Sequence, residues 1–215
     1  MMELVVNNIN KTIRKKMILS NVSLCLKSGN IYGFVGRNGS GKTMLFRALS
    51  GLMGIDSGSI VWGGKTLHQD FSVLPNQGII IENAGLYPDL TGMQNLTYLA
   101  NLTKKIGQEE IVNAITRVGL NPQDKKVYGK YSLGMKQRLA IAQAIMEKPD
   151  IIMLDEPTNA LDETGVEVIR KVILEEKERG ALILVASHNK EDIQVLADEW
   201  YRVENGQVIR QGEGL

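Results

Sequence analysis

Residues 36–43 constrain the fold of this chain more than any other segment, because they match the phosphate-loop pattern G-x-x-x-x-G-K-[ST]. The apolar residues 31–35 before them are typical of a short buried strand, and residues 44–49 after them are typical of a helix that ends at Gly51. Glycines let the backbone curl so that several N–H groups face one anion, and the helix N-terminus adds a favourable field of roughly 0.3–1 kcal/mol. The pattern therefore predicts a strand, a phosphate-binding loop and a helix in direct succession.

Within this loop, each residue type has an expected part in holding a nucleoside triphosphate. The Lys42 ammonium is expected to reach the β- and γ-phosphates, and the Thr43 hydroxyl is expected to bind Mg²⁺. A chance glycine-rich turn is the alternative, and the strand and helix signals on either side disfavour it. The residues expected to contact the nucleotide here are Gly36, Arg37, Asn38, Gly39, Ser40, Gly41, Lys42 and Thr43.

Composition sets wider limits on the kind of protein. The 215 residues, 43% hydrophobic and 23% charged, are enough for one large globular domain with or without an inserted lobe. A net charge of +1 does not favour a nucleic-acid partner. The single cysteine, Cys25, excludes an intrachain disulfide and is expected to pack within a strand. No apolar run approaches the ~20 residues of a membrane-spanning helix, so any membrane role is expected to use docking on another chain.

The hydrophobic pattern divides the chain into an α/β core and a lobe that is entirely helical. Two or three short strands are expected before residue 31, and the core's buried strands favour a largely parallel sheet. Later strands are expected at 151–154, 182–186, 200–203 and 207–210, and helices at 93–102, 108–118, 134–147 and 163–179. The core is thus expected to span about residues 1–90 and 149–215, and the helical subdomain about residues 91–148.

A second group of polar residues follows two of these apolar strands. Asp155, at the end of the first, is expected to hold Mg²⁺ directly or through water, and Glu156 is expected to polarise the attacking water. Ordinary strand termination is the alternative, which the earlier phosphate loop disfavours. His188 follows the other strand, where it could hydrogen-bond the γ-phosphate or serve only a structural role.

A competing motif lies directly after His188. Residues 189–192 match N-K-x-D, a guanine-recognition pattern, and they too follow a strand. A GTPase would also show D-x-x-G at the Mg²⁺-binding strand, but here that strand is followed by Asp155-Glu156-Pro157-Thr158 without the glycine. A GTPase therefore stays an alternative that is disfavoured.

Taken together, these motifs resemble the ATP-binding subunits of ABC transporters over essentially the whole chain. Residues 36–43 resemble the Walker A motif, 151–156 resemble Walker B with its catalytic glutamate, and 159–162 resemble the D-loop; Ser187-His188 resembles the switch histidine. The most specific resemblance is Tyr-Ser-Leu-Gly-Met-Lys-Gln-Arg at 131–138, which is similar to the ABC signature at the family's spacing before Walker B. Leucine and methionine replace the first glycine and the glutamine of LSGGQ, as in the branch of bacitracin- and lantibiotic-type exporters.

The resemblance implies a P-loop NTPase (RecA-like) core with an antiparallel β subdomain, an inserted helical subdomain that carries the signature, and a single ABC ATPase domain over residues 1–215. It implies ATP and Mg²⁺, a second ATPase subunit packed head to tail, and an integral-membrane permease that this chain serves from the cytoplasmic face as a peripheral subunit, soluble when isolated. It also implies a second set of nucleotide contacts, which are Ser132, Leu133, Gly134, Met135 and Asp162.

Besides the signature, two further positions depart from the family's pattern. The Q-loop glutamine stands a few residues before a Leu-Tyr-Pro-x-Leu-Thr segment, here 86–91, which places Glu82 at that position with an expected part in Mg²⁺ binding and hydrolysis; Gln77 is the alternative. The family often stacks adenine on an aromatic ring ahead of Walker A, and the corresponding region here is Ile13-Arg14. Apolar contact with Ile13 or stacking by Arg14 is expected to substitute.

The leading function is therefore ATP hydrolysis that powers transport, with export favoured by the resemblance. A soluble ABC-type ATPase that acts on ribosomes or DNA is the alternative from another class. Such proteins typically carry tandem ATPase units or long coiled-coil arms, and this chain shows one unit, no such arm and no basic bias.

Overall fold

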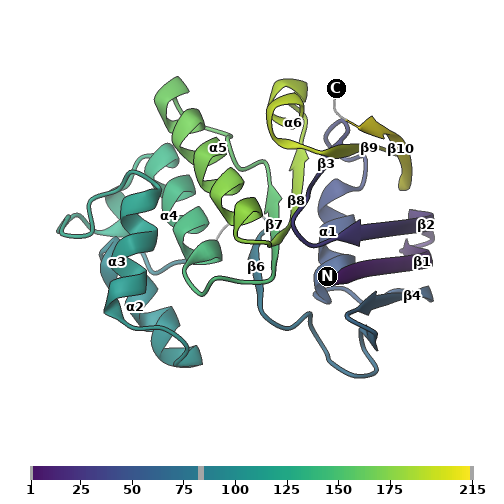
Figure 1. Ribbon diagram of the computed structural model, residues 1–215, viewed down its shortest axis with the longest axis horizontal. Coiled ribbons are helices and arrows are strands. Elements are labelled where there is room, and N and C mark those ends of the chain that lie inside the picture. The colour runs from purple at the N-terminus through teal and green to yellow at the C-terminus, as the bar shows by residue number, and fades with distance from the viewer. Residues whose placement is uncertain (1, 82–84, 214–215) are drawn as a thin grey trace.

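The computed structural model describes residues 2–81 and 85–213, which form two β-sheets and a group of helices. In Figure 1, the helices α2, α3 and α4 lie at the left end, the strands β1, β2 and β4 lie at the right end, and the larger sheet stands between them. Among the described residues, no helix combines the length and the apolar character that crossing a membrane requires.

The larger sheet is parallel except at one edge. Its central strands are buried and almost wholly apolar, as expected where both faces of a sheet are covered. Among the described residues of this sheet, only β9 and β10 pair antiparallel, so the expectation of a largely parallel α/β core is confirmed. In order across the sheet, the strands are β10 (Gln207–Glu213), β9 (Glu199–Glu204), β3 (Ile31–Val35), β8 (Leu182–Ser187), β7 (Ile151–Asp155) and β6 (Gln77–Ile80).

The smaller sheet is the antiparallel one. Its first two strands form a long hairpin rather than the short strands expected, because their pairing continues past the shifts of register that interrupt the alternation of buried and exposed residues. Cys25 is exposed rather than packed, since it falls on the outward face of this alternation. In order, the strands are β2 (Lys16–Lys27), β1 (Glu3–Ile13), β4 (Ser57–Trp62) and β5 (Lys65–Thr66).

Alternate residues of β7 separate two hydrophobic clusters. Ile152 and Leu154 join the cluster that holds the apolar faces of the helices, whereas Ile151 and Met153 join the cluster that α1 shares with both sheets. Side chains of a strand point alternately to opposite faces, so one sheet supports both layers. The helices are α1 (Lys42–Ser50), α2 (Gly92–Thr103), α3 (Gln108–Arg117), α4 (Leu133–Ile145), α5 (Glu163–Glu178), α6 (Lys190–Leu196) and the short 3₁₀-helix η1 (Tyr128–Lys130).

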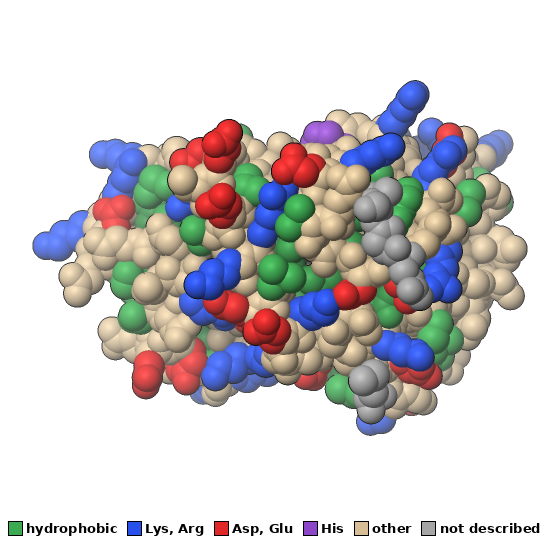
Figure 2. Space-filling model, turned by 45° about the horizontal axis from the view of Figure 1, so that its top comes forward, with side chains coloured by type: hydrophobic (Ala, Val, Ile, Leu, Met, Phe, Trp, Pro, Cys, Tyr) green, Lys and Arg blue, Asp and Glu red, His purple; other side chains and the backbone are tan. Residues whose placement is uncertain are grey.

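The short elements β5, β6, η1 and α6 were not predicted from the sequence pattern. β6 has four residues, including a glutamine and a glycine, and α6 has seven residues, so neither is long enough for a clear periodic signal. The charged side chains also carry no large-scale pattern on the face drawn in Figure 2, where acidic and basic residues are interspersed.

Candidate nucleotide-binding site

The candidate site lies where three parallel strands end. The register pairs Val35 of β3 with Ser187 of β8, and Asp155 of β7 with Ala186, so the carboxyl ends of these strands meet at one edge of the sheet. This edge is the one at which β8 leads towards α6 in Figure 1. The loops that follow the three strands carry the phosphate-loop residues, the two acids and His188.

The phosphate loop follows β3 and ends at α1. Gly39 and Gly41 have φ angles of 79° and 112°, in the left-handed region that L side chains rarely adopt. A Cβ on Gly36 would lie 2.4 Å from the Val203 carbonyl oxygen, so only glycine fits there. Because α1 begins at Lys42, the first N–H groups of the helix are available to an anion at its N-terminus.

Lys42 places a cation inside this loop. Its side chain is only 6% exposed, and its ammonium donates to the Gly36 carbonyl oxygen at 2.7 Å. The same nitrogen lies 3.9 Å from a carboxylate oxygen of Glu156. A buried ammonium beside glycine N–H groups gives the loop the donor set that a polyphosphate requires.

Thr43 and Asp155 bring two oxygen ligands together from distant parts of the chain. The Thr43 hydroxyl donates to a carboxylate oxygen of Asp155 at 2.6 Å, across 112 residues of sequence. Mg²⁺ prefers oxygen ligands and commonly uses one or two protein groups with phosphate oxygens and waters. The hydroxyl and carboxylate beside the phosphate loop therefore fit this ion.

Glu156 is held by the segment that carries His188. One carboxylate oxygen accepts from the His188 backbone N–H at 3.0 Å, and the other lies 2.8 Å from His188 Nδ1. The Ser187 hydroxyl donates to the same second oxygen at 3.3 Å. The structure thus brings together the two residues, separated by 32 positions, that the sequence placed in the hydrolytic step.

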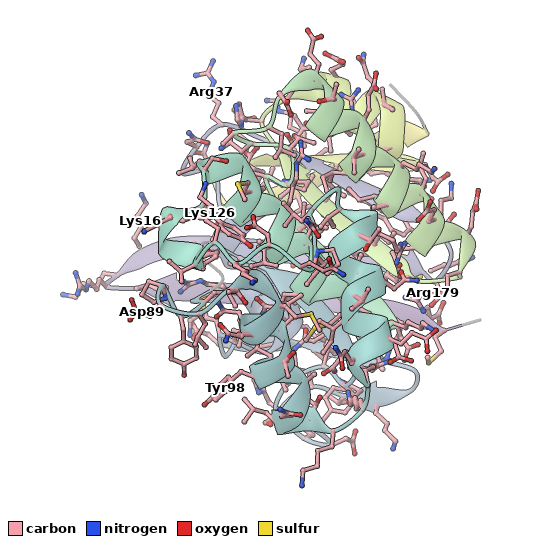
Figure 3. All side chains as sticks on the ribbon, turned by 90° about the vertical axis from the view of Figure 1, so that its left-hand side faces the viewer. Lys16, Arg37, Asp89, Tyr98, Lys126 and Arg179 are labelled. Carbon is pink, nitrogen blue, oxygen red and sulfur yellow. The ribbon has the colours of Figure 1, made fainter. Side chains whose placement is uncertain are left out.

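A cavity of about 520 Å³ opens beside the loop, and its far wall comes from the β1–β2 hairpin and the β9–β10 turn. Ile13 is not among the residues that line it, whereas its partner across the hairpin, Lys16, is. Arg37 and Lys16 extend outwards from the molecule in Figure 3. The lining residues are Lys16, Met17, Ile18, Asn38, Gly39, Ser40, Gly41, Lys42, Thr43, Met44, Asp155, Glu156, Asn205 and Gly206.

The residues that resemble the signature gather at a second cavity, of about 650 Å³. Ser132 caps α4 by accepting from the Met135 backbone N–H at 3.2 Å, and the adjoining Leu133 is 70% exposed. Asp162 caps α5 by accepting from the Gly165 N–H at 3.0 Å. This cavity, lined by Ser132, Leu133, Gly134, Met135 and Asp162 among others, shares no lining residue with the phosphate-loop cavity in the described part of the chain.

The hydrogen-bond donors around Asp162 make its carboxyl group more acidic, with a lowered pKa. Its pKa lies below the ordinary value because the Gly165 backbone N–H, the Thr164 hydroxyl and the Arg138 guanidinium all favour the ionised form. Arg138 Nη2 lies 3.1 Å from Asp162 Oδ1, which joins α4 to the start of α5. Asp162 is therefore a negative charge beside Ser132 rather than a neutral acceptor.

The two residues considered for the Q-loop position are Glu82 and Gln77. Glu82 lies outside the described residues. Gln77 stands opposite Ile151 at the start of β7, and its amide donates to the carbonyl oxygen of Ser50 at 3.0 Å, at the end of α1. Gln77 is therefore at the edge of the sheet opposite the phosphate loop.

The N-K-x-D motif has a structural use. Asp192 is only 1% exposed, and its carboxylate accepts from Arg170 Nη2 at 2.7 Å and from the Thr158 hydroxyl. A carboxylate buried in this way cannot read a guanine base. It ties α6 to α5 and to the loop after β7 instead.

Several residues at the site were not predicted from the sequence, among them Met17 and Gly206, which line the cavity, and Gln137. Gln137 of α4 donates to the backbone carbonyl oxygens of Glu156 at 3.1 Å and Pro157 at 3.2 Å. The sequence signal for Gln137 was a polar side chain on a helix that also carries buried apolar residues. The helical pattern does not show which backbone atoms this side chain contacts.

The fold and these two cavities define a P-loop protein built to bind a nucleoside triphosphate. A family model described as "ABC transporter" matches residues 19–159. The chain therefore belongs to the ABC transporter family, as an ATP-binding cassette.

Named relatives support this placement. The chain is 48% identical to the uncharacterized ABC transporter ATP-binding protein YybJ of Bacillus subtilis, over 94% of this chain and 92% of that protein. It is 34% identical to the lantibiotic transport ATP-binding protein SrtF of Streptococcus pyogenes, over 97% and 90%. Among solved structures, a dimeric bacterial ABC transporter cassette matches with a TM-score of 0.87 at 22% identity over 98% of both chains, which shows the same fold.

Proposed function

We propose that this chain hydrolyses ATP to power export through a separate membrane subunit, to which it binds on the cytoplasmic face. The observation that supports this most strongly is the position of Glu156, whose carboxylate lies 3.9 Å from the Lys42 ammonium at the edge of the phosphate-loop cavity. A carboxylate that is held in place by His188 and Ser187 next to the proposed γ-phosphate position is suited to accept a proton from water.

In the proposed reaction, the loop amides and Lys42 bind the β- and γ-phosphates. Thr43, Asp155 and Glu82 would hold Mg²⁺, which when bound neutralises charge that develops on the phosphate oxygens. Glu156 takes a proton from the attacking water as the water oxygen bonds to the γ-phosphorus and the bond to the β-phosphate oxygen breaks. His188 keeps the Glu156 carboxylate oriented and hydrogen-bonds the γ-phosphate. The adenine is proposed to lie against the hairpin wall near Met17, beyond Ile13.

The second cavity supports a role for a second ATPase subunit. Ser132 and Asp162 are the N-cap residues of α4 and α5, and both line the second cavity. Among the described residues, none lines both this cavity and the phosphate-loop cavity. We propose that the signature residues of one subunit complete the ATP site of another, packed head to tail. In this arrangement residues 1–215 are one ABC ATPase domain, with a core of about 1–90 and 149–215 and a helical subdomain of about 91–148.

The substitution Glu156→Gln tests both parts of this proposal. It keeps the shape of the side chain and removes the base, so phosphate release is expected to fall about 100-fold or more. The trapped ATP is expected to shift the mass from monomer to dimer, measured by light scattering with Mg-ATP. Lys42→Ala is the control, and it is expected to remain monomeric because it cannot hold the phosphates.

Unchanged phosphate release in Glu156→Gln would contradict the assignment of Glu156 as the base. A monomer with bound ATP would contradict pairing of two identical copies and direct the search to a different ATPase chain or to the membrane subunit.

A further inference from the structure

The backbone at Glu156 has an unusual conformation for a residue with a side chain. Its φ is +52°, in the left-handed region that favours glycine, directly after β7. Such a conformation persists only where the surrounding structure holds it in place. It also determines where the carboxylate points, because the side chain leaves the backbone at this residue.

Hydrogen bonds hold the Glu156 peptide from two sides. The Glu156 N–H donates to the Ala186 carbonyl oxygen of β8 at 2.8 Å. On the other side, Gln137 Nε2 donates to the Glu156 carbonyl oxygen at 3.1 Å and to the Pro157 carbonyl oxygen at 3.2 Å. The sheet therefore fixes the start of this turn, and one side chain of α4 bridges the two peptides that follow.

The position of Gln137 on its helix adds a second consequence. α4 begins at Leu133 with Ser132 as its N-cap, and Gln137 lies between Met135 and Arg138, which both line the second cavity. A helix turn is rigid compared with a loop because its backbone is hydrogen-bonded throughout. Gln137 thus forms a direct polar link between the helix that starts at the signature and the backbone of Glu156.

We propose that Gln137 is a positioning residue for Glu156: it holds the left-handed turn so that the carboxylate stays between His188 and the phosphate-loop cavity. This inference rests on the proposed function, since it assigns Gln137 an effect only through Glu156. Gln137 is not among the described residues that line the phosphate-loop cavity. Its loss is therefore expected to slow hydrolysis while leaving nucleotide binding intact.

The test replaces Gln137 with methionine, which keeps the length of the side chain and removes its N–H donors. We expect kcat for ATP hydrolysis to fall about tenfold or more, with the ATP dissociation constant unchanged within twofold. Gln143→Met is the matched control: Gln143 lies on the same helix, is also half-buried, and its side-chain oxygen has no partner among the described residues. This control is expected to leave both quantities within twofold.

A second comparison separates positioning from a general structural effect. If Gln137 acts through Glu156, then Gln137→Met in the Glu156→Gln background changes single-turnover hydrolysis by less than twofold, because the base it would position is already absent. If Gln137→Met slows single-turnover hydrolysis in the Glu156→Gln background as much as it does in the wild type, the proposal is overturned. An equal loss of kcat in Gln143→Met, or a loss of ATP affinity in Gln137→Met, would overturn it as well. If the methionine variant does not fold, Gln137→Glu removes the same donors at the same size. Full hydrolysis by Glu156→Gln alone would instead count against the proposed function.

Discussion

At the scale of single residues, Asp162 shows how one side chain can serve both the fold and the candidate site. Its carboxylate caps α5 through the Gly165 N–H, and it lies with Ser132 in the lining of the second cavity. Arg138 reaches the same carboxylate from α4. These donors lower the pKa of Asp162, so the folded protein prefers this residue ionised.

This preference predicts an acid-dependent loss of stability. Because the folded-state pKa lies below the unfolded value of about 3.9, the contribution is complete above that pH and disappears as the pH falls through the folded value. Asp162→Asn keeps a neutral helix cap. The variant is therefore expected to be less stable than the wild type at pH 7 and to approach it in stability below about pH 4, measured by urea unfolding at stepped pH values. A difference that stays constant down to pH 3 would contradict this view.

At the scale of elements, a close contact between β6 and α4 determines how near α4, the helix that begins at the signature, lies to the sheet. A Cβ on Gly78 would stand 1.9 Å from the Ala144 carbonyl oxygen, which is backbone and cannot rotate away. The glycine is therefore required by close approach rather than by its own dihedral angles. It lets α4 lie directly against the edge strand of the parallel sheet.

Gly78→Ala is expected to reduce the free energy of unfolding by about 1–3 kcal/mol, because the added methyl group forces the strand and the helix apart. Gly54→Ala is the control, since nothing lies within 4 Å of the added Cβ there, and it is expected to stay within about 0.5 kcal/mol of the wild type. Chemical denaturation measures both. Equal effects of the two substitutions would show that the close approach is not limiting.

At the scale of the whole molecule, the helices at one end are tied to the core by a charged contact as well as by apolar packing. Arg117 of α3 binds Glu175 at 2.9 Å and Glu176 at 2.7 Å, both on α5. The Glu176 side chain is only 3% exposed and is also bound by Arg179 at 2.8 Å. Removing Arg117 would leave that buried carboxylate with a reduced set of donors.

Arg117→Met is accordingly expected to lower the free energy of unfolding by about 1–3 kcal/mol, since hydrogen bonds to charged groups contribute on this scale. The comparison is Arg202→Met, because Arg202 and its partner Glu204 are both more than half exposed and such pairs contribute little. That variant is expected to change stability by less than about 0.5 kcal/mol. If Arg117→Met and Arg202→Met lower the free energy of unfolding by similar amounts, burial of the Arg117 ion pair does not contribute to stability.

Local patterns explain which parts could be predicted from the sequence. The phosphate loop, the strand before Asp155 and the capped starts of α4 and α5 depend on residues within a few positions of one another. The short β6 and α6 carry too few residues for a periodic signal. Contact of Ile13 with the base stays a prediction, and the hairpin residues that line the phosphate-loop cavity are Lys16, Met17 and Ile18.

The sequence by itself determined the α/β class, the family and the phosphate loop, since a glycine pattern between a strand and a helix leaves few other folds. Only the tertiary structure decided that Asp192 is buried against Arg170 rather than open to a base, and that Gln137 holds the left-handed turn at Glu156. Those contacts join residues 19 to 22 positions apart on different elements. Their geometry follows from how helices pack on the sheet, which no local pattern encodes.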